Sequence, residues 1–96
     1  MIISYRDRKT GDFANGKFVK AFQAIEKQAG KRLAILDAAT SVNDLRNLPS
    51  NRFAALHGDR QGQFSIRINR QWRVCFEWPD GAAGPSEVEI SKHYGD

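Results

Sequence analysis

A change of hydrophobic period part-way along the chain constrains its fold more than any other feature. Apolar residues first recur at steps of three and four, the period of an amphipathic helix. They are Phe18, Phe22, Ile25, Ala29, Leu33 and Leu36. Between residues 63 and 78 the period becomes two, which is typical of strands with one face in a core. We therefore expect a helix from Phe18 to near Thr40, followed by a β-rich second half.

The period-two region predicts a hairpin. Residues 63–68 and 72–78 alternate between apolar and polar side chains, and Asn69-Arg70-Gln71 joins them. We expect a tight turn there, with Asn69 or Arg70 at positive φ. Further strands are predicted at residues 87–92, 53–56 and 2–5, the last two short.

The segments outside these elements read as loops and caps. Gly11 and Gly16 interrupt a first attempt at a helix, and Asp12 or Asn15 is a candidate cap for the segment that follows. The segment 44–51 is predicted to be a turn or short helical loop that Pro49 ends.

Packing the helix on this sheet gives an α+β sandwich of two layers. The helix covers the strand face that carries Ile66 and Val74, and the opposite face carries Arg67 and Arg73. By parity, Glu89, Ser91 and His93 lie on that second face, whereas Lys92 and Tyr94 lie on the core side. We expect the second face to be open and concave. Trp72 and Trp78 fit the core face better than a role as base-stacking platforms.

Length and composition bound the class of protein. Ninety-six residues, 41% of them hydrophobic, suffice for one small core, so we expect a single domain over residues 1–96. No apolar run approaches the roughly 18 residues that a membrane span needs, so no membrane partner is expected. One cysteine, Cys75, forms no internal disulfide, which favours a cytoplasmic location. One cysteine and two histidines, His57 and His93, indicate no metal site.

The net charge of +4 is small, but its distribution is uneven. Six arginines, no lysine and a single acid, Asp59, lie between Arg46 and Arg73. Guanidinium groups bind phosphate through paired hydrogen bonds, so this block favours an anionic partner. A solvated β-surface that happens to use arginine is the alternative.

The same region carries a family resemblance. Gly58-Asp-Arg-Gln-Gly-Gln-Phe-Ser-Ile-Arg67 and Asn69-Arg-Gln-Trp-Arg-Val-Cys-Phe76 resemble the core signature of the HigB branch of the RelE/ParE toxins. The likeness extends to residues 33–40, 48–52, 76–78 and 88–90, about two thirds of the chain. It implies a compact RelE/ParE-like fold, with an antiparallel-rich sheet of 4–5 strands and N-terminal helices packed on one face.

The resemblance also implies a function. Such toxins of type II toxin–antitoxin modules cleave messenger RNA on the translating ribosome and are neutralised by a HigA-like helix-turn-helix antitoxin. They reach operator DNA only through the antitoxin complex. The chemistry needs no metal or cofactor: the ribose 2′-hydroxyl attacks the adjacent phosphate, leaving a 2′,3′-cyclic phosphate and a 5′-hydroxyl. It requires a base, cations near the phosphate and an acid for the leaving oxygen.

The resemblance assigns candidate roles. Arg73 matches the arginine that contacts phosphate, unless it pairs across the sheet with Glu77 or Glu89. His57 occupies a position that is basic in many relatives, so it is a phosphate ligand, a general acid or base, or a surface histidine without a role. Arg67 belongs to the proposed RNA-binding face.

Arg60 and Arg70 lie on predicted turns, where they are candidates to bind RNA or an acidic surface of the antitoxin.

The C-terminus departs from the common pattern. Many relatives end in Asp-Tyr-His, whereas this chain reads Lys92-His93-Tyr94, and a histidine of some relatives is Ala54 here. Either His93 is the general acid or base, or Tyr94 is, with Lys92 supplying positive charge. Three functions stay open: a ribosome-dependent nuclease, a ParE-like toxin that inhibits DNA gyrase by binding, and a weakened toxin that mainly binds antitoxin.

Overall fold

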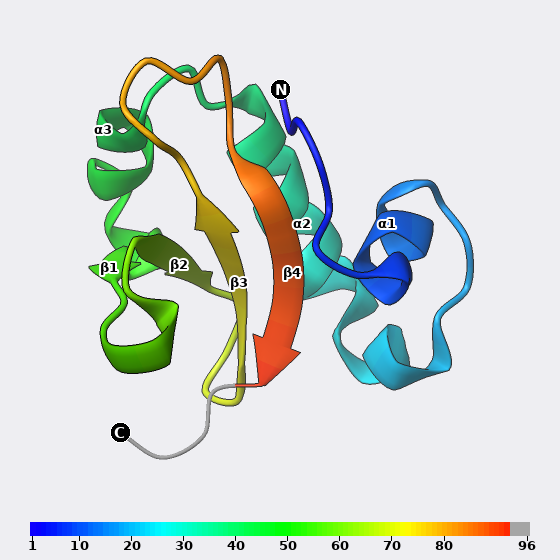
Figure 1. The fold of residues 1–96 in the computed structure, drawn as a ribbon. Helices are drawn as coiled ribbons and strands as arrows, with labels where there is room; N and C mark the ends of the chain where they lie inside the picture. Colours follow the sequence, from blue (N-terminus) through cyan, green and yellow to red (C-terminus); the bar gives the residue numbers. More distant parts are fainter. Residues whose placement is uncertain (93–96) are drawn as a thin grey trace.

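The computed structural model describes residues 1–92, and it places helices on one face of an antiparallel sheet (Figure 1). The helical elements are α1 (Arg8–Ala14), a 3-10 helix η1 (Lys20–Ile25), α2 (Glu26–Ala38), α3 (Val42–Arg46) and the 3-10 turns η2 (Pro49–Asn51) and η3 (Gly58–Arg60). The strands are β1 (Ala54–Ala55), β2 (Gln63–Arg67), β3 (Trp72–Glu77) and β4 (Ser86–Lys92). The predicted α+β class is confirmed.

Within residues 1–92, the four strands form one sheet in the order β1-β2-β3-β4, and every pair is antiparallel. The β2–β3 hairpin has the predicted register, with Ile66 opposite Val74 and Arg67 opposite Arg73. The alternation therefore identified both the strands and their inward faces.

The hairpin turn differs from the prediction, because neither Asn69 nor Arg70 has a positive φ. Instead, the Asn69 side chain closes the turn: its Oδ1 accepts hydrogen bonds from the backbone N–H groups of Gln71 (2.8 Å) and Trp72 (2.9 Å). An Asx turn of this kind supplies the reversal without the left-handed backbone of a two-residue loop.

The predicted helix from Phe18 to Thr40 is wrong at its start. A 3-10 helix covers residues 20–25, α2 begins at Glu26, and Phe18 is 65% exposed. The rest of the apolar stripe is buried as expected. It forms the core with one face of the sheet: Phe22, Ile25, Ala29, Leu33 and Leu36 pack with Ile66, Val74, Phe76, Val88 and Ile90. In Figure 1, α2 lies behind β3 and β4.

The N-terminal segment contains a helix where the sequence indicated an interruption. α1 runs through Gly11 and is capped by Asp7, whose Oδ1 accepts a hydrogen bond from Thr10 N at 2.9 Å. Neither Asp12 nor Asn15 caps the next helical element, because η1 begins after Val19 without a side-chain cap. Gly11 faces the Tyr5 side chain, and a Cβ at this position would lie 3.7 Å from the ring, an ordinary contact distance. Helix α1 thus forms despite the low helix propensity of glycine, with the Asp7 cap satisfying one of its first N–H groups.

The strand predicted at residues 2–5 is reduced to a single parallel bridge between Tyr5 and Val88. Ser4 O accepts a hydrogen bond from Val88 N at 3.1 Å, and Arg6 N donates to Val88 O at 2.9 Å. The segment thus covers the free edge of β4, which blunts an edge that is otherwise open to pairing.

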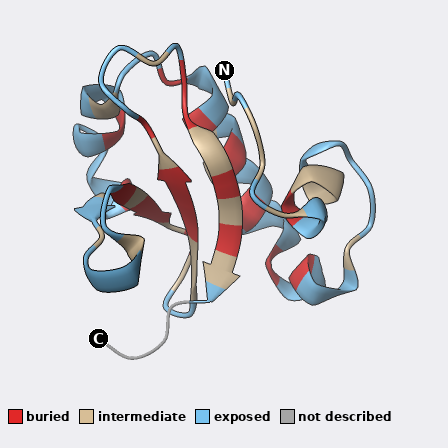
Figure 2. Ribbon diagram, viewed as in Figure 1, coloured by how far each residue is buried: buried red, intermediate tan, exposed pale blue. Residues whose placement is uncertain are grey.

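The face of the sheet turned away from α2 is not open along its whole length. Figure 2 shows β3 buried through its middle, and Ser65 and Cys75 on the second face are 4% and 0% exposed. The expected open, concave face is therefore confined to one end of the sheet. Within residues 1–92, no helix has the length and apolarity to cross a membrane.

Candidate functional site

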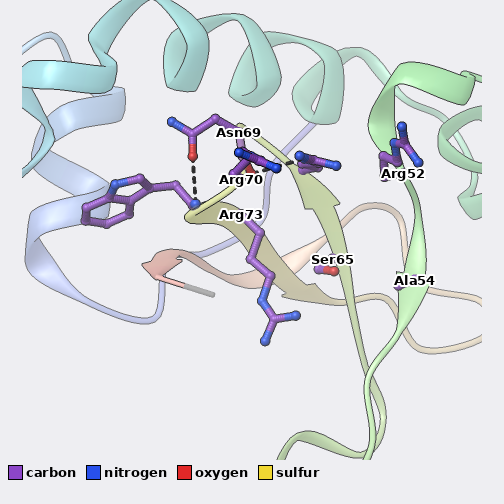
Figure 3. Close-up of a pocket in the computed structure, with 8 residues that line it drawn as sticks. Arg52, Ala54, Ser65, Asn69, Arg70 and Arg73 are labelled. Atoms are coloured by element: carbon purple, nitrogen blue, oxygen red, sulfur yellow. Dashed lines mark hydrogen bonds between the residues drawn. The ribbon is translucent and has the colours of Figure 1, made fainter. Parts of the chain in front are cut away.

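Arginines from neighbouring strands meet at one end of the sheet. Arg67 of β2 and Arg73 of β3 are directly opposite each other. Ala54 of β1 pairs with Ser65, so continuing that register brings Arg52, just before β1, beside the Arg67 end of β2. A cavity of about 340 Å³ opens here, which we call the arginine cavity (Figure 3). Its lining residues are Arg52, Ala54, Ser65, Arg67, Asn69, Arg70, Trp72 and Arg73.

The charge of the arginine cavity is uncompensated by the described part of the chain. The lining includes four guanidinium groups and no carboxylate. Within residues 1–92, none of these four arginines forms an ion pair. Like charges placed opposite each other on adjacent strands destabilise a sheet. An arrangement that costs folding free energy in the free protein is expected where an anion supplies the missing charge.

Among residues 1–92, Arg73 forms no ion pair with a carboxylate. Glu77 pairs with Arg6 at 3.1 Å, and Glu89 pairs with Arg60 at 3.0 Å and with Arg6 at 3.8 Å. The alternative in which Arg73 pairs with Glu77 or Glu89 is therefore wrong. The Nε atom of Arg73 is buried without a hydrogen-bond partner among residues 1–92.

Local backbone structure holds the other arginines at the cavity. The Nε atom of Arg67 donates to the carbonyl of Asn69 at 3.2 Å, which ties this guanidinium to the hairpin turn. Arg70 is exposed on the same turn and also lines the cavity. Arg52 ends the η2 turn in the left-handed conformation, with φ 46°. These three side chains come from separate elements, so only the folded chain assembles them.

The middle of the same sheet face is closed by a different arginine. Arg60 donates hydrogen bonds to Gln63 and Glu89, each at 3.0 Å. Its partial burial opposes the charged form, but the bond and attraction to Glu89, with the nearby Cys75, outweigh this and raise the pKa of Arg60. Burial raises the pKa of the Cys75 thiol, against the opposing effect of Arg60 and Arg73. Cys75 is fully buried, and its thiol ionises less readily than an exposed thiol.

Comparison with known proteins identifies the family. The sequence profile of the RelE-like toxin of type II toxin–antitoxin system HigB matches residues 7–90. The chain belongs to the HigB-like toxin family. It is 48% identical over 70 residues to "Toxin HigB-1" of Vibrio cholerae serotype O1, a match that covers 73% of this chain and 74% of that protein.

Two further likenesses are more distant. "Endoribonuclease HigB" of Proteus vulgaris is 36% identical over 52 residues, which cover 54% of this chain and 55% of that protein. The structure resembles the YoeB/ParE toxin from Agrobacterium tumefaciens with a TM-score of 0.53 at 16% identity, over 97% of this chain and 98% of that one. This likeness confirms the RelE/ParE-like fold. Membership of a type II family implies an antitoxin partner for this HigB-like toxin.

The structure brings three of the predicted site residues together and separates the others. Arg67, Arg70 and Arg73 line the arginine cavity. Arg60 is held by Glu89, away from this lining. His57 is exposed just beyond β1, at the opposite end of that strand from Arg52.

Of the three C-terminal candidates, only Lys92 lies among the residues that the structure describes. Lys92 has its Nζ 5.5 Å from the centre of the Trp72 ring, on the core-side parity expected from the sequence, and does not line the arginine cavity. His93 and Tyr94 lie outside the described residues. Within residues 1–92, no three His, Cys, Asp or Glu side chains gather as a metal site requires.

Sequence reasoning missed Arg52 as a site residue. The signal was its place in the arginine block, two residues before the short strand that pairs with β2. Trp72 was expected to pack, and it does meet Phe22 edge-to-face at 5.7 Å, but it also forms part of the cavity wall. Trp78 packs as expected: it is buried, and its Nε1 donates to Ala82 O at 3.2 Å.

Proposed function

We propose that this HigB-like toxin is a ribosome-dependent, metal-independent endonuclease that cleaves messenger RNA in the arginine cavity. The observation that supports this most directly is the set of four guanidinium groups without a carboxylate in the lining. Such a surface attracts a phosphodiester and repels a divalent cation. The Proteus vulgaris relative named as an endoribonuclease favours a nuclease over an inhibitor of gyrase.

In this proposal, the arginines act on the charge of the reacting phosphate. The ribose 2′-oxygen forms a bond to phosphorus and the bond to the 5′-oxygen breaks, which leaves a 2′,3′-cyclic phosphate and a 5′-hydroxyl. Negative charge accumulates on the phosphate oxygens in the transition state, where positioned donors give the largest effect. Arg73 is the central group, because its guanidinium has no internal anion among residues 1–92 and lies opposite Arg67.

We assign proton transfer to His93 and Tyr94. The described lining of the cavity contains no histidine, tyrosine or carboxylate, so a base for the 2′-hydroxyl and an acid for the 5′-oxygen must come from elsewhere. Ser91 pairs with Arg73 across β3 and β4, and His93 follows Ser91 by two residues in the sequence. We rank His57 and Lys92 below them for proton transfer, because neither residue lines the arginine cavity.

We propose that a HigA-like helix-turn-helix antitoxin neutralises the toxin and links it to operator DNA. The type II family supports an antitoxin in general. A test is to co-express candidate helix-turn-helix proteins from the neighbouring reading frames and measure growth. Restored growth together with a stable complex supports this assignment, whereas neutralisation by a protein of another class contradicts it.

Cleavage itself is tested by primer extension on a message in a purified translation system, with and without ribosomes. Wild-type protein should give discrete cuts that require translation and leave a 2′,3′-cyclic phosphate and a 5′-hydroxyl. Arg73→Ala should abolish them. Arg46→Gln is the matched control, because Arg46 is a nearby arginine that stacks on Phe53 outside the cavity.

The other two functions predict different outcomes in cells that express the protein. DNA damage with intact message would identify an inhibitor of gyrase and refute the nuclease. If wild-type protein slows growth no more than a double variant with His93→Ala and Tyr94→Ala, the chain is a weakened toxin whose main activity is antitoxin binding.

A further inference from the structure

We infer that Arg52 forms a second phosphate position, so that the arginine cavity holds two consecutive phosphates of a single RNA strand. Arg73 serves the phosphate that reacts, and Arg52 serves its neighbour. This rests on the proposed function for the nature of the ligand, but it concerns binding and not cleavage.

The arginines span more of the sheet than one phosphate occupies. Arg73 lies on β3, Arg67 on β2, and Arg52 two residues before β1. Adjacent strands are about 4.8 Å apart, so the backbones of the first and last arginine are separated by about two such steps, roughly 10 Å. Figure 3 shows the Arg73 and Arg52 guanidinium groups standing apart, with Ser65 between Arg73 and Ala54.

The charge count leads to the same conclusion. A phosphodiester carries one negative charge, whereas the lining carries four positive groups and no carboxylate. Within residues 1–92, no ion pair neutralises any of them. A second phosphate brings the charge of the ligand closer to that of the lining. Ser65 and Ala54, which are small and neutral, also line the cavity and leave room for the RNA strand between Arg73 and Arg52.

Arg52 is held by a built element and not by a mobile loop. Asn51, the residue before it, is fully buried. Its Nδ2 donates to Leu45 O at 3.1 Å, and its Oδ1 accepts from Arg32 Nη1 at 2.8 Å. Arg52 N then donates to Pro49 O at 3.1 Å, which fixes the left-handed backbone. A guanidinium on a preorganised backbone loses less entropy when it binds.

The test compares two non-cleavable ligands in direct binding experiments. Both are RNA oligonucleotides with 2′-deoxyribose at the cleavage position: a dinucleotide with one phosphate and a trinucleotide with two. For wild-type protein we expect the second phosphate to raise affinity by about tenfold at low salt. Arg52→Asn should lose that gain and keep the affinity for the dinucleotide. Asparagine tolerates positive φ, so this variant preserves the backbone.

Two controls separate the contact from general charge and from folding. Arg52→Lys should recover part of the gain, because it restores the charge without the planar fork. Arg46→Gln should bind both ligands like wild type. The slope of log affinity against log salt for the trinucleotide should fall by about 0.7 for Arg52→Asn, the value for one phosphate contact on a single strand.

The inference is overturned if Arg52→Asn weakens both ligands equally, or neither. An equal loss places Arg52 on the same phosphate as Arg73, and no loss removes it from the site. Failure of the proposed function is a separate result: the trinucleotide gain would persist in a wild-type protein that leaves translated messages intact.

Discussion

Replacing Arg73 by methionine should make the free protein more stable, although most substitutions do the opposite. Methionine keeps the length of the apolar stem and removes the guanidinium. The buried Nε donor of Arg73 has no partner among residues 1–92, and such a group costs about 1–3 kcal/mol. Relief from the like charge of Arg67 directly opposite adds about 0.2–1 kcal/mol. Since Arg73 is only half-buried, we expect a net gain of about 1–2 kcal/mol.

Arg60→Met is the matched control on the same sheet face. Arg60 bonds to Glu89 and Gln63 at 3.0 Å each, so its removal leaves Glu89 with Arg6 alone, at 3.8 Å. We expect a loss of about 1 kcal/mol, limited because Arg60 is partly exposed. The two arginines should therefore change the free energy of unfolding in opposite directions.

Urea unfolding of the toxin without its antitoxin measures both effects. The urea midpoint should rise for Arg73→Met and fall for Arg60→Met, with unchanged slopes. A change of 1 kcal/mol shifts the melting temperature of a domain this size by about 4–8 °C. Adding the non-cleavable trinucleotide at 100 times its dissociation constant should stabilise wild type by about 2.7 kcal/mol. Arg73→Met should gain much less at that same concentration.

The reasoning is refuted if Arg73→Met loses as much stability as Arg60→Met. Arg73 would then hold the sheet together, and the uncompensated charge of the arginine cavity would not be kept for an anion. A stable Arg73→Met protein that binds the trinucleotide as tightly as wild type would also refute it.

Three further predictions concern groups outside the reacting centre. Asn51→Ala should lower the free energy of unfolding in urea by about 2–3 kcal/mol, because the buried amide loses two hydrogen bonds, and should weaken trinucleotide binding through Arg52. Hydrogen bonds from Thr40 lower the pKa of Asp44 from 3.8. Wild type should therefore have a larger free energy of unfolding than Asp44→Asn above that pH, and the difference should vanish as acid protonates the carboxylate of the folded protein. Burial raises the pKa of Cys75 from 9.0, so stability should fall above that pH, where only the unfolded thiol ionises, and Cys75→Ala should remove this slope.

Each of these has a contradicting result. Wild-type stability in Asn51→Ala would show that the η2 turn does not depend on the buried amide. For Asp44→Asn, a difference in stability from wild type that is constant between neutral pH and about pH 3 would show that the ionised carboxylate is not stabilised by Thr40. A Cys75 thiol that reacts with a disulfide reagent at neutral pH as fast as in unfolded protein would show that it is not buried.

The sequence predicted those elements in which local pattern and tertiary packing agree. Alternation at residues 63–78 gave β2 and β3 with their core faces, and the three-four spacing gave the buried stripe of α2. It failed where one contact decided the outcome. Helix α1 runs through Gly11 from a side-chain cap at Asp7, and the hairpin turn is closed by the side chain of Asn69. Neither contact has a periodic signature.

By itself, the sequence determined the α+β class, the inward face of each hairpin strand, and the family whose signature the arginine block carries. These follow from residue spacing, because side-chain period and secondary structure are linked by backbone geometry. Only the tertiary structure decided which arginines pair with a carboxylate and which line the cavity. Glu89 takes Arg60 as an internal partner, while register leaves Arg67 and Arg73 facing each other and brings Arg52 to their side. Arginines of one sequence block thus come to lie in different electrostatic environments, because Glu89 neutralises Arg60 from another strand and not from a neighbouring position along the chain.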